Sequence, residues 1–209
     1  MFVNHPRSLR YYFGRILVRL FKLKKKSYSW LNEDNVLDWL THYKNNGIYI
    51  DIGANHPDRM NNTKLFYERG WRGINIEPDK AGYDLFCEKR PNDININRAI
   101  GTGKFEYWFE DGGLVNTFNK EWADHFGLKN KVELELKPLR EVFEENKLSK
   151  VDFISIDVEG FEEEVLRSND WEKYRADVIC LEGLKGGYLK KFGYRTVFWD
   201  GFNSYYKSI

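Results

Sequence analysis

Two short apolar runs of the sequence each end in an acidic residue, and a glycine turn follows the first. The residues at these two ends are Asp51, Gly53, Ala54, Asn55, Glu77 and Pro78. In a parallel α/β sheet such positions meet at the carboxyl ends of adjacent strands, where these sheets bind nucleotide-like cofactors. We expect Glu77 to accept hydrogen bonds from both hydroxyls of a ribose, and Asp51 to bind a cofactor ammonium or to organise the turn. The pattern therefore predicts a cofactor site.

The glycine pattern limits the kind of cofactor. The sequence has no G-x-G-x-x-G, the glycine-rich loop that binds the pyrophosphate of a dinucleotide. A cofactor with a ribose and an adenine but no phosphate, S-adenosylmethionine (SAM), fits these residues better. Asn97 and Ala99 end a third apolar run, and we expect the adenine to meet that strand end, through backbone groups or through a side chain such as Asn97 or Asp93.

A second group of polar residues follows the most strand-like run of the chain, residues 151–158. Asp157 and Glu159 lie beside the predicted cofactor site and can orient or deprotonate a hydroxyl group, and Asp157 is also a candidate cofactor contact. Glu182 ends the next predicted strand, so Asp157 and Glu182 can share an oxygen-ligand site suited to magnesium. The alternative, which we prefer, is that no metal is bound, that Glu159 caps the following helix and that Glu182 pairs with an arginine.

The remaining candidate catalytic and substrate-binding residues lie mostly in predicted loops. His56, within the glycine turn, can act as a general base or can hold the turn through a backbone hydrogen bond. Asn116 and Thr117 belong to the polar segment 112–117, which we interpret as a substrate loop because loops at strand ends carry specificity. Glu182 is a third candidate substrate contact. Most of the aromatic residues are expected in the core, with a sugar-stacking platform among them as the alternative.

Strands alternate with helices along the chain, which predicts a mostly parallel sheet with helices on both faces. Strands are expected at 48–52, 73–76, 94–100, 105–109, 132–136, 151–158 and 177–181, and helices at 33–43 (capped by Asn32), 61–69, 79–89, 138–146 and 161–167. Asp200 and Gly201 form a turn dipeptide between 194–199 and 204–209, which predicts a closing antiparallel hairpin. The predicted fold is therefore α/β and Rossmann-like, with an amino-terminal helical extension.

The composition is that of one α/β domain with a short extension. The chain has 209 residues, of which 42% are hydrophobic and 31% charged, and a mean hydropathy of −0.65, so we expect a soluble protein. Cys87 and Cys180 are the two cysteines, and Cys180 lies in an apolar run. Free cysteines of this kind suit a reducing cytoplasm better than a disulfide scaffold.

The charge is distributed unevenly. Residues 1–26 hold eight of the 33 basic residues and no acidic one, which leaves 25 basic against 32 acidic residues in 27–209. Arg15 and Arg19 interrupt the apolar stretch of this arm, which argues against a transmembrane helix or a signal peptide. Either the arm is an amphipathic helix on an anionic membrane surface or an acidic partner, or it is an ordinary first helix docked on the domain 27–209. We expect a cytoplasmic protein, with peripheral membrane contact through 1–26 as an option.

The ordered motifs of the chain resemble those of the FkbM-type SAM-dependent methyltransferases. The resemblance runs from about Ser27 to Ile209. Its motifs are S-Y-S at 27–29, E-D at 33–34, D-I-G-A-N-H-P at 51–57, N-T at 62–63, F-Y-E-R-G-W-R-G-I-N-I-E-P at 66–78, R-P at 90–91, N-R-A-I at 97–100, I-D-V-E-G at 156–160, D-G-F-N at 200–203 and Y-Y at 205–206. The chain departs from the family at 30–32, where Trp-Leu-Asn replaces Q-x-G, and at 115–117, where Val-Asn-Thr stands where Ser-Thr is common.

This resemblance implies a class I methyltransferase fold and methyl transfer from SAM to a hydroxyl group, as in members that act on sugars of surface polysaccharides or on natural products. We therefore expect an O-methyltransferase in polysaccharide biosynthesis, with a small-molecule or glycan acceptor and no nucleic-acid partner. Two other functions stay open. One is an NAD(P)-dependent sugar oxidoreductase on a similar sheet, and the other is a non-catalytic surface-binding module led by the basic arm.

Overall fold

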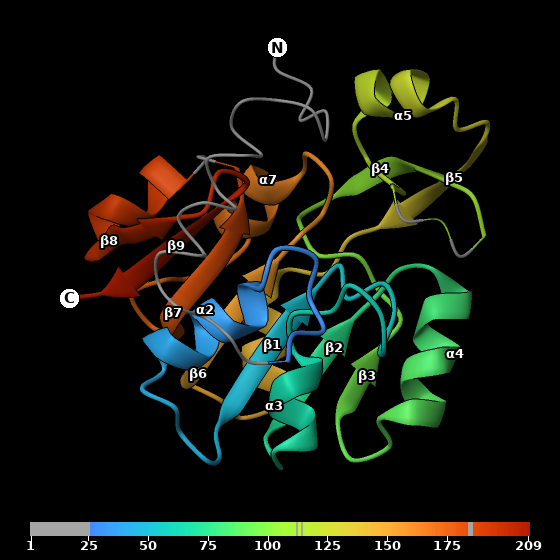
Figure 1. Ribbon diagram of the computed structural model, residues 1–209. Helices are drawn as coiled ribbons and strands as arrows, with labels where there is room; N and C mark the ends of the chain where they lie inside the picture. Colours follow the sequence, from blue (N-terminus) through green and yellow to red (C-terminus); the bar gives the residue numbers. More distant parts are fainter. Residues whose placement is uncertain (1–25, 112, 114, 184–185) are drawn as a thin grey trace.

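The computed structural model describes residues 26–111, 113, 115–183 and 186–209. The predictions for the basic arm therefore lie outside the described residues, apart from Lys26. A seven-stranded sheet in the order β3-β2-β1-β6-β7-β9-β8 forms the centre of the domain (Figure 1). Its strands are β1 (Ile48–Ile52), β2 (Arg72–Ile76), β3 (Ile94–Ile96), β6 (Lys150–Ile156), β7 (Arg175–Glu182), β8 (Tyr194–Trp199) and β9 (Asn203–Ser208).

The order of the strands creates the crevice in which α/β sheets bind ligands. From β1 the chain proceeds outward to β2 and β3, and it later returns to the other side of β1 with β6 and β7. All of these neighbours pair in parallel, so their carboxyl ends share one edge of the sheet. The direction of winding reverses between β1 and β6, and ligands bind at such a switch point. The predicted Rossmann-like fold is confirmed.

Alternating residues of the strands feed two separate cores. From β1, Ile50 and Ile52 pack with the helices α6 (Leu139–Glu145) and α7 (Glu162–Arg167) on one face of the sheet. Tyr49 faces the other way, toward α2 (Glu33–Leu40) and α3 (Lys64–Glu68). This division follows from the period of two in a strand. The apolar run around Cys180 is likewise a buried strand, as predicted.

The closing hairpin is also present. β9 pairs antiparallel with β7 and with β8, so the start of β9 lies at the same edge of the sheet as the end of β7. Glu182 of β7 and Asn203 of β9 lie opposite each other in this register. The hairpin thus brings the carboxyl-terminal segment to the crevice.

A second, two-stranded sheet stands beside the crevice edge of the first (Figure 1). It consists of β4 (Lys104–Phe109) and β5 (Asn130–Glu135), which pair antiparallel, and the helix α5 (Lys120–Phe126) connects them. The remaining helices are α4 (Lys80–Lys89) and the 3-10 helix η1 (Gly186–Phe192). No helix in the described part of the chain has both the length and the apolar character that crossing a membrane requires.

Several predicted boundaries differ from the structure. The third strand is predicted to extend to Ile100 but ends at Ile96, where the backbone turns and the amide of Arg98 donates to the carbonyl of Ile96 at 3.1 Å. The side-chain amide of Asn97 donates to the carbonyls of Glu77 and Pro78, each at 2.9 Å. Asn32 takes the N-cap position of α2 without a side-chain capping bond, because its backbone is left-handed with φ of 67°. The helices α5 and η1 have no counterpart among the predicted elements.

Candidate active site

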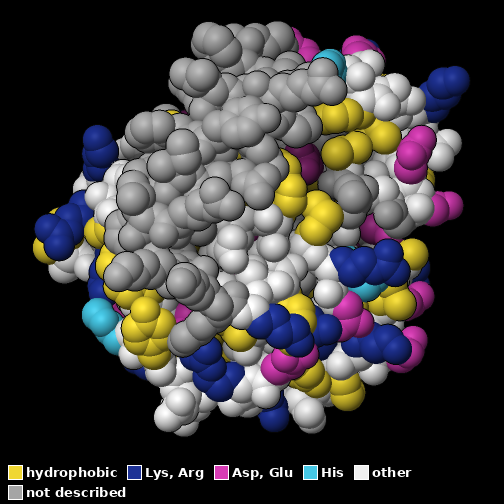
Figure 2. Space-filling model, viewed as in Figure 1, with side chains coloured by type: hydrophobic (Ala, Val, Ile, Leu, Met, Phe, Trp, Pro, Cys, Tyr) yellow, Lys and Arg dark blue, Asp and Glu magenta, His cyan; other side chains and the backbone are white. Residues whose placement is uncertain are grey.

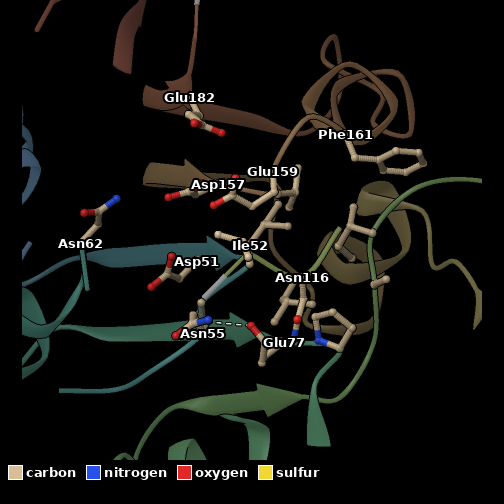
Figure 3. Close-up of a pocket in the computed structure, with 18 of the residues that line it drawn as sticks. Asp51, Ile52, Asn55, Asn62, Glu77, Asn116, Asp157, Glu159, Phe161 and Glu182 are labelled. Atoms are coloured by element: carbon tan, nitrogen blue, oxygen red, sulfur yellow. Dashed lines mark hydrogen bonds between the residues drawn. The ribbon is translucent and has the colours of Figure 1, made fainter. Parts of the chain in front are cut away.

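A pocket of about 350 Å³ opens at the carboxyl edge of the large sheet. The acidic residues Glu182, Asp157, Asp51 and Glu77 follow one another across it, in the spatial order of β7, β6, β1 and β2 (Figure 3). The small sheet and α5 contribute aromatic residues to another wall, among them Tyr107 and Trp122. The structure thus brings together residues that lie far apart in the sequence.

The glycine turn after β1 is fixed by close contacts with two other strand ends. The amides of Gly53 and Ala54 donate to the carbonyl of Ile76, at 3.0 and 3.2 Å, and the amide of Asp157 donates to Ile52 at 3.1 Å. Gly53 has a φ of 76°, and a Cβ atom there would lie 1.9 Å from the carbonyl oxygen of Asp157. Only glycine fits both the backbone conformation and this approach.

Glu77 is held rigidly at the end of β2. Its Oε2 accepts from the amide of Asn55 at 2.7 Å and its Oε1 from the amide of Asp79 at 2.8 Å (Figure 3). Each carboxylate oxygen keeps a further lone pair that can accept from a hydroxyl group. The side chain is 5% exposed, and burial raises its pKa to about 7.

A buried arginine, Arg90, supports Asp51 indirectly through Thr63 and Asn61. No pattern in the sequence indicated this structural role. Asp51 accepts from the hydroxyl of Thr63 at 2.7 Å and from Asn61 at 3.3 Å. Arg90 in turn donates to Thr63, Asn61 and the carbonyl of Pro57. Burial raises the pKa of Asp51, and the bond from Thr63 opposes the rise. Asp51 therefore organises the turn, and it also borders the pocket.

Asp157 and Glu159 form the acidic centre of the pocket. Asp157 is exposed to the pocket, whose walls partly desolvate it, and Glu159 is half-buried. Burial raises the pKa of both carboxyl groups, and neighbouring acids raise it further: Glu162 and Asp51 for Asp157, and Asp157 and Glu162 for Glu159. Glu159 has a left-handed backbone with φ of 51°. A strained non-glycine residue of this kind marks a position whose side-chain direction the fold enforces.

Thr117 keeps Glu159 in place instead of lining the pocket. Its hydroxyl donates to the carbonyl of Glu159 at 2.7 Å, and its side chain is fully buried. Thr117 also pairs with Trp108 of β4 through two backbone hydrogen bonds, of 2.8 and 2.9 Å. The small sheet is thereby tied to the acidic centre.

The site residues predicted from the sequence divide into those that line the pocket and those that do not. Those that line the pocket are Asp51, Gly53, Ala54, Asn55, Glu77, Pro78, Ala99, Asn116, Asp157, Glu159 and Glu182. Outside its lining lie His56 and Asn97, like Thr117. His56 accepts from the amide of Asp58 at 3.0 Å, the turn-holding arrangement that the sequence left open, and burial lowers its pKa. The roles assigned to these residues stay predictions.

The opening segment of the domain supplies pocket residues that sequence reasoning missed. Trp30 and Glu33 line the pocket together with Phe202 and Asn203 of the closing hairpin. Asn32, which precedes Glu33, has a left-handed backbone with φ of 67°, at a position where the resembling family has glycine. Asparagine is among the few other residues that adopt this conformation readily. The replacement of glycine by asparagine was thus a usable signal in the sequence.

The pocket is strongly acidic. Among the described residues that line it, six are acidic and one, Arg98, is basic. The acidic residues are Glu33, Asp51, Glu77, Asp157, Glu159 and Glu182. In the described part of the chain, no group of three or more histidine, cysteine, aspartate or glutamate side chains comes together as a metal site, around Asp157 and Glu182 included. The pocket thus suits a ligand with positive charge.

Comparison with known families gives one match. A sequence model of the methyltransferase FkbM domain matches residues 51–193. The matched range contains five of the six acidic residues of the pocket and leaves out Glu33. No curated protein matches the chain.

Proposed function

The chain belongs to the FkbM methyltransferase family, and from this premise we propose that it is a SAM-dependent O-methyltransferase. Its acceptor in this proposal is a hydroxyl group of a sugar or of a glycan precursor, which would place the enzyme in polysaccharide biosynthesis. The family resemblance inferred from the ordered motifs is confirmed by the match over residues 51–193.

The acidity of the pocket is the observation that supports SAM most directly. SAM carries a sulfonium and an ammonium group, so an acidic pocket attracts it. The pyrophosphate of NAD(P) carries negative charge and would meet the same acids unfavourably, with Arg98 as the single basic residue of the described lining. This difference disfavours the sugar oxidoreductase.

The residues at the ends of β1, β2 and β3 fit the parts of SAM. Glu77 has lone pairs available for the two ribose hydroxyls, and its backbone bonds fix its orientation. Asp51 offers a carboxylate to the ammonium group. Apolar side chains near these strand ends can enclose the adenine; they are Ile76, Pro78, Ala99, Ile100 and Tyr107. A pocket of about 350 Å³ is within the usual range of roughly 300–1,000 Å³ for small-molecule sites.

When bound, SAM supplies a methyl group on a positively charged sulfur, which needs no further activation as an electrophile. The protein has to bring the acceptor oxygen behind that methyl group and to take up its proton. We assign proton uptake to the carboxylate of Asp157 or Glu159. The raised pKa of each group suits this role, because a general base works best with a pKa near the working pH.

Calorimetric titration of the full chain with SAM, S-adenosylhomocysteine and NAD tests this proposal. We expect SAM and S-adenosylhomocysteine to bind and NAD not to bind. The substitution Glu77→Gln should weaken the binding of SAM and of S-adenosylhomocysteine by roughly 10- to 100-fold, the loss expected for hydrogen bonds to a charged group. The control is Glu88→Gln, an exposed position on α4. Preferential binding of NAD would favour the oxidoreductase, and binding of neither ligand would favour the surface-binding module.

A further inference from the structure

The helix α5 places a tryptophan against the turn that carries the acidic centre. Trp122 is half-buried and lines the pocket, as do Asp157 and Glu159. A Cβ atom at Gly160, the residue after Glu159, would lie 3.7 Å from the indole Nε1 of Trp122. The indole and the two carboxyl groups to which we assign proton uptake therefore border one cavity from neighbouring positions.

A chain of hydrogen bonds ties the helix to this turn. The hydroxyl of Thr117 donates to the carbonyl of Glu159 at 2.7 Å and accepts from the amide of Asn119 at 2.9 Å. Asn119 is the N-cap residue of α5, and its side-chain oxygen accepts from the amides of Glu121 and Trp122, at 2.9 and 3.3 Å. These bonds connect the turn at Glu159 with the first turn of α5. They hold Trp122 at a set place relative to the acidic centre.

Phe126 extends the aromatic surface by one turn of the helix. Its ring centroid lies 5.7 Å from that of Trp122, with the ring planes at 50°, and the residue is 41% exposed. Both residues line the pocket. On the face shown in Figure 2, hydrophobic side chains gather below the position of α5, next to an acidic side chain at the border of the grey region. Apolar surface beside acidic groups suits a sugar ring, which is apolar on its faces and hydroxylated at its edge.

We propose that Trp122 and Phe126 form the platform on which the acceptor ring lies during methyl transfer. In this step the acceptor oxygen bonds to the methyl carbon as the bond from that carbon to the sulfur of SAM breaks, S-adenosylhomocysteine leaves, and the acceptor proton passes to a carboxylate. The acceptor oxygen must therefore lie within hydrogen-bond reach of Asp157 or Glu159.

A ring in this position lies next to Trp122, because the indole is fixed beside the turn of Glu159 and Gly160. A larger acceptor can extend from there along the pocket toward the ends of β7 and β9, away from the residues assigned to SAM. The proposal rests on the methyltransferase function argued above. It adds the residues that bind the ring of the acceptor.

A second tryptophan of the small sheet provides a matched control. Trp108 of β4 points to the face of the small sheet opposite Tyr107, because successive residues of a strand alternate. It is half-buried like Trp122 but lies outside the pocket lining. The ammonium groups of Lys120 and Lys131 lie over its ring, 5.4 and 4.9 Å from the centroid. Substitutions at Trp108 therefore alter the small sheet without altering the platform.

Fluorine NMR of the full chain labelled with 5-fluorotryptophan tests the proposal. The chain has seven tryptophans, and the variants Trp122→Phe and Trp108→Phe assign the resonances of these two residues. The protein is first saturated with S-adenosylhomocysteine and then titrated with the methyl glycosides of glucose, galactose, mannose and rhamnose. We expect at least one glycoside to shift the Trp122 resonance and to leave that of Trp108 in place.

Kinetics then measure the contribution of the platform. Release of S-adenosylhomocysteine from SAM is followed with the glycoside that binds most tightly. Trp122→Gln should raise the KM for this glycoside roughly tenfold, and Trp122→Phe, which keeps an aromatic ring, should recover most of the loss. Trp108→Gln should change the KM by less than about twofold. Affinity for S-adenosylhomocysteine, measured by calorimetry, should be unchanged in all three variants.

The outcomes separate this proposal from the function it rests on. If S-adenosylhomocysteine binds but no glycoside shifts the Trp122 resonance, or if Trp122→Gln behaves like Trp108→Gln, the platform is overturned and the methyltransferase stands. The platform is also overturned if Trp122→Gln loses affinity for S-adenosylhomocysteine, which would place the indole at the cofactor. If S-adenosylhomocysteine fails to bind the unaltered chain, the methyltransferase proposal itself fails.

Discussion

Two glutamates lie at opposite ends of the same pocket, and both are almost completely buried. Glu77, at the end of β2, is 5% exposed, and Glu33, at the start of α2, is 4% exposed. Burial raises the pKa of Glu77 to about 7. The pKa of Glu33 is raised to about 8, by burial first and then by the negative charge of Asp200. The two residues differ in the origin of their hydrogen-bond donors.

Glu77 accepts from two backbone amides, whereas Glu33 accepts from the nearby amide of Leu31 and from a side chain at the other end of the chain. The donors to Glu77 are the backbone amides of Asn55 and Asp79, in the two turns that carry the cofactor motifs. The side-chain donor to Glu33 is Asn203, which is 170 positions away. The end of the pocket that we propose for the cofactor, the cofactor end, is therefore built from backbone geometry. The opposite end, which the proposed function leaves for the acceptor and which we call the acceptor end, also depends on this tertiary contact. We therefore expect substitutions at 30–32 to change the acceptor end more than the cofactor end.

The largest expected effect comes from Gly53, which joins the cofactor end to the acidic centre. In Gly53→Ala the new Cβ would collide with the carbonyl of Asp157 at 1.9 Å, in a backbone conformation that disfavours alanine. We expect a loss of about 3 kcal/mol in the free energy of unfolding, measured with denaturant, and loss of S-adenosylhomocysteine binding.

Gly70→Ala is the matched control for the backbone alone. Gly70 has a φ of 101°, and a Cβ atom there meets nothing within 4 Å. This variant should lose only about 1 kcal/mol and keep its ligand affinity. Equal losses in the two variants would show that the contact with Asp157 does not matter.

Asp157 lies between the two ends, so its replacement separates chemistry from binding. Asp157→Asn keeps the size of the side chain but removes its capacity to accept a proton. We expect turnover to fall roughly 100-fold, the low end of the range for general acid–base catalysis, while S-adenosylhomocysteine affinity changes less than about threefold. Steady-state kinetics and calorimetry measure the two quantities. A variant with full turnover would exclude Asp157 as the base, and one with lost affinity would assign it to the cofactor end.

Thr117 tests whether the small sheet positions the acidic centre. Thr117→Val removes the hydroxyl that donates to the strained Glu159, whereas Thr117→Ser retains it. We expect about tenfold lower turnover in the valine variant and a value within about twofold of the unaltered chain in the serine variant, because one hydrogen bond contributes up to about 1.5 kcal/mol. S-adenosylhomocysteine affinity should be unchanged in both. Similar turnover in the two variants would limit Thr117 to a packing role.

The cofactor end was predictable because strand, turn and acid are contiguous in the sequence. The run 48–52, the glycine turn and Glu77 each carry a local signal, and the sheet topology that unites them follows from alternating strands and helices. Arg90 shows the limit of this reasoning. Arg90 enters the sequence analysis only as part of the R-P motif, whereas in the structure it is 2% exposed and donates to Thr63 and Asn61 beneath the glycine turn.

The acceptor end was not predictable from local patterns. In the sequence, Glu33 has the pattern of an ordinary first-turn acid of a helix, and its contact with Asn203 in the pocket depends on the hairpin that ends the domain. The helix α5 was missed because its seven residues, with Trp122 and Phe126 toward the pocket and a single fully buried side chain, carry too short a hydrophobic pattern. Tertiary contacts decide such elements.

The smallest expected effect is the pH dependence of cofactor binding, which compares the two glutamates directly. A cation and the ribose hydroxyls both favour the ionised form of Glu77, so the complex has a lower Glu77 pKa than the free protein, where it is about 7. Binding therefore releases protons near neutral pH, and SAM affinity rises with pH and levels off above about pH 7. Between about pH 6 and about pH 8 we expect SAM affinity to rise roughly fivefold.

Calorimetry in buffers of different ionisation enthalpy measures the protons released when SAM binds. Glu77→Gln should reduce the release, and Glu33→Gln, at the acceptor end, should leave it intact. Loss of the release in Glu33→Gln instead would place the cofactor at the opposite end of the pocket.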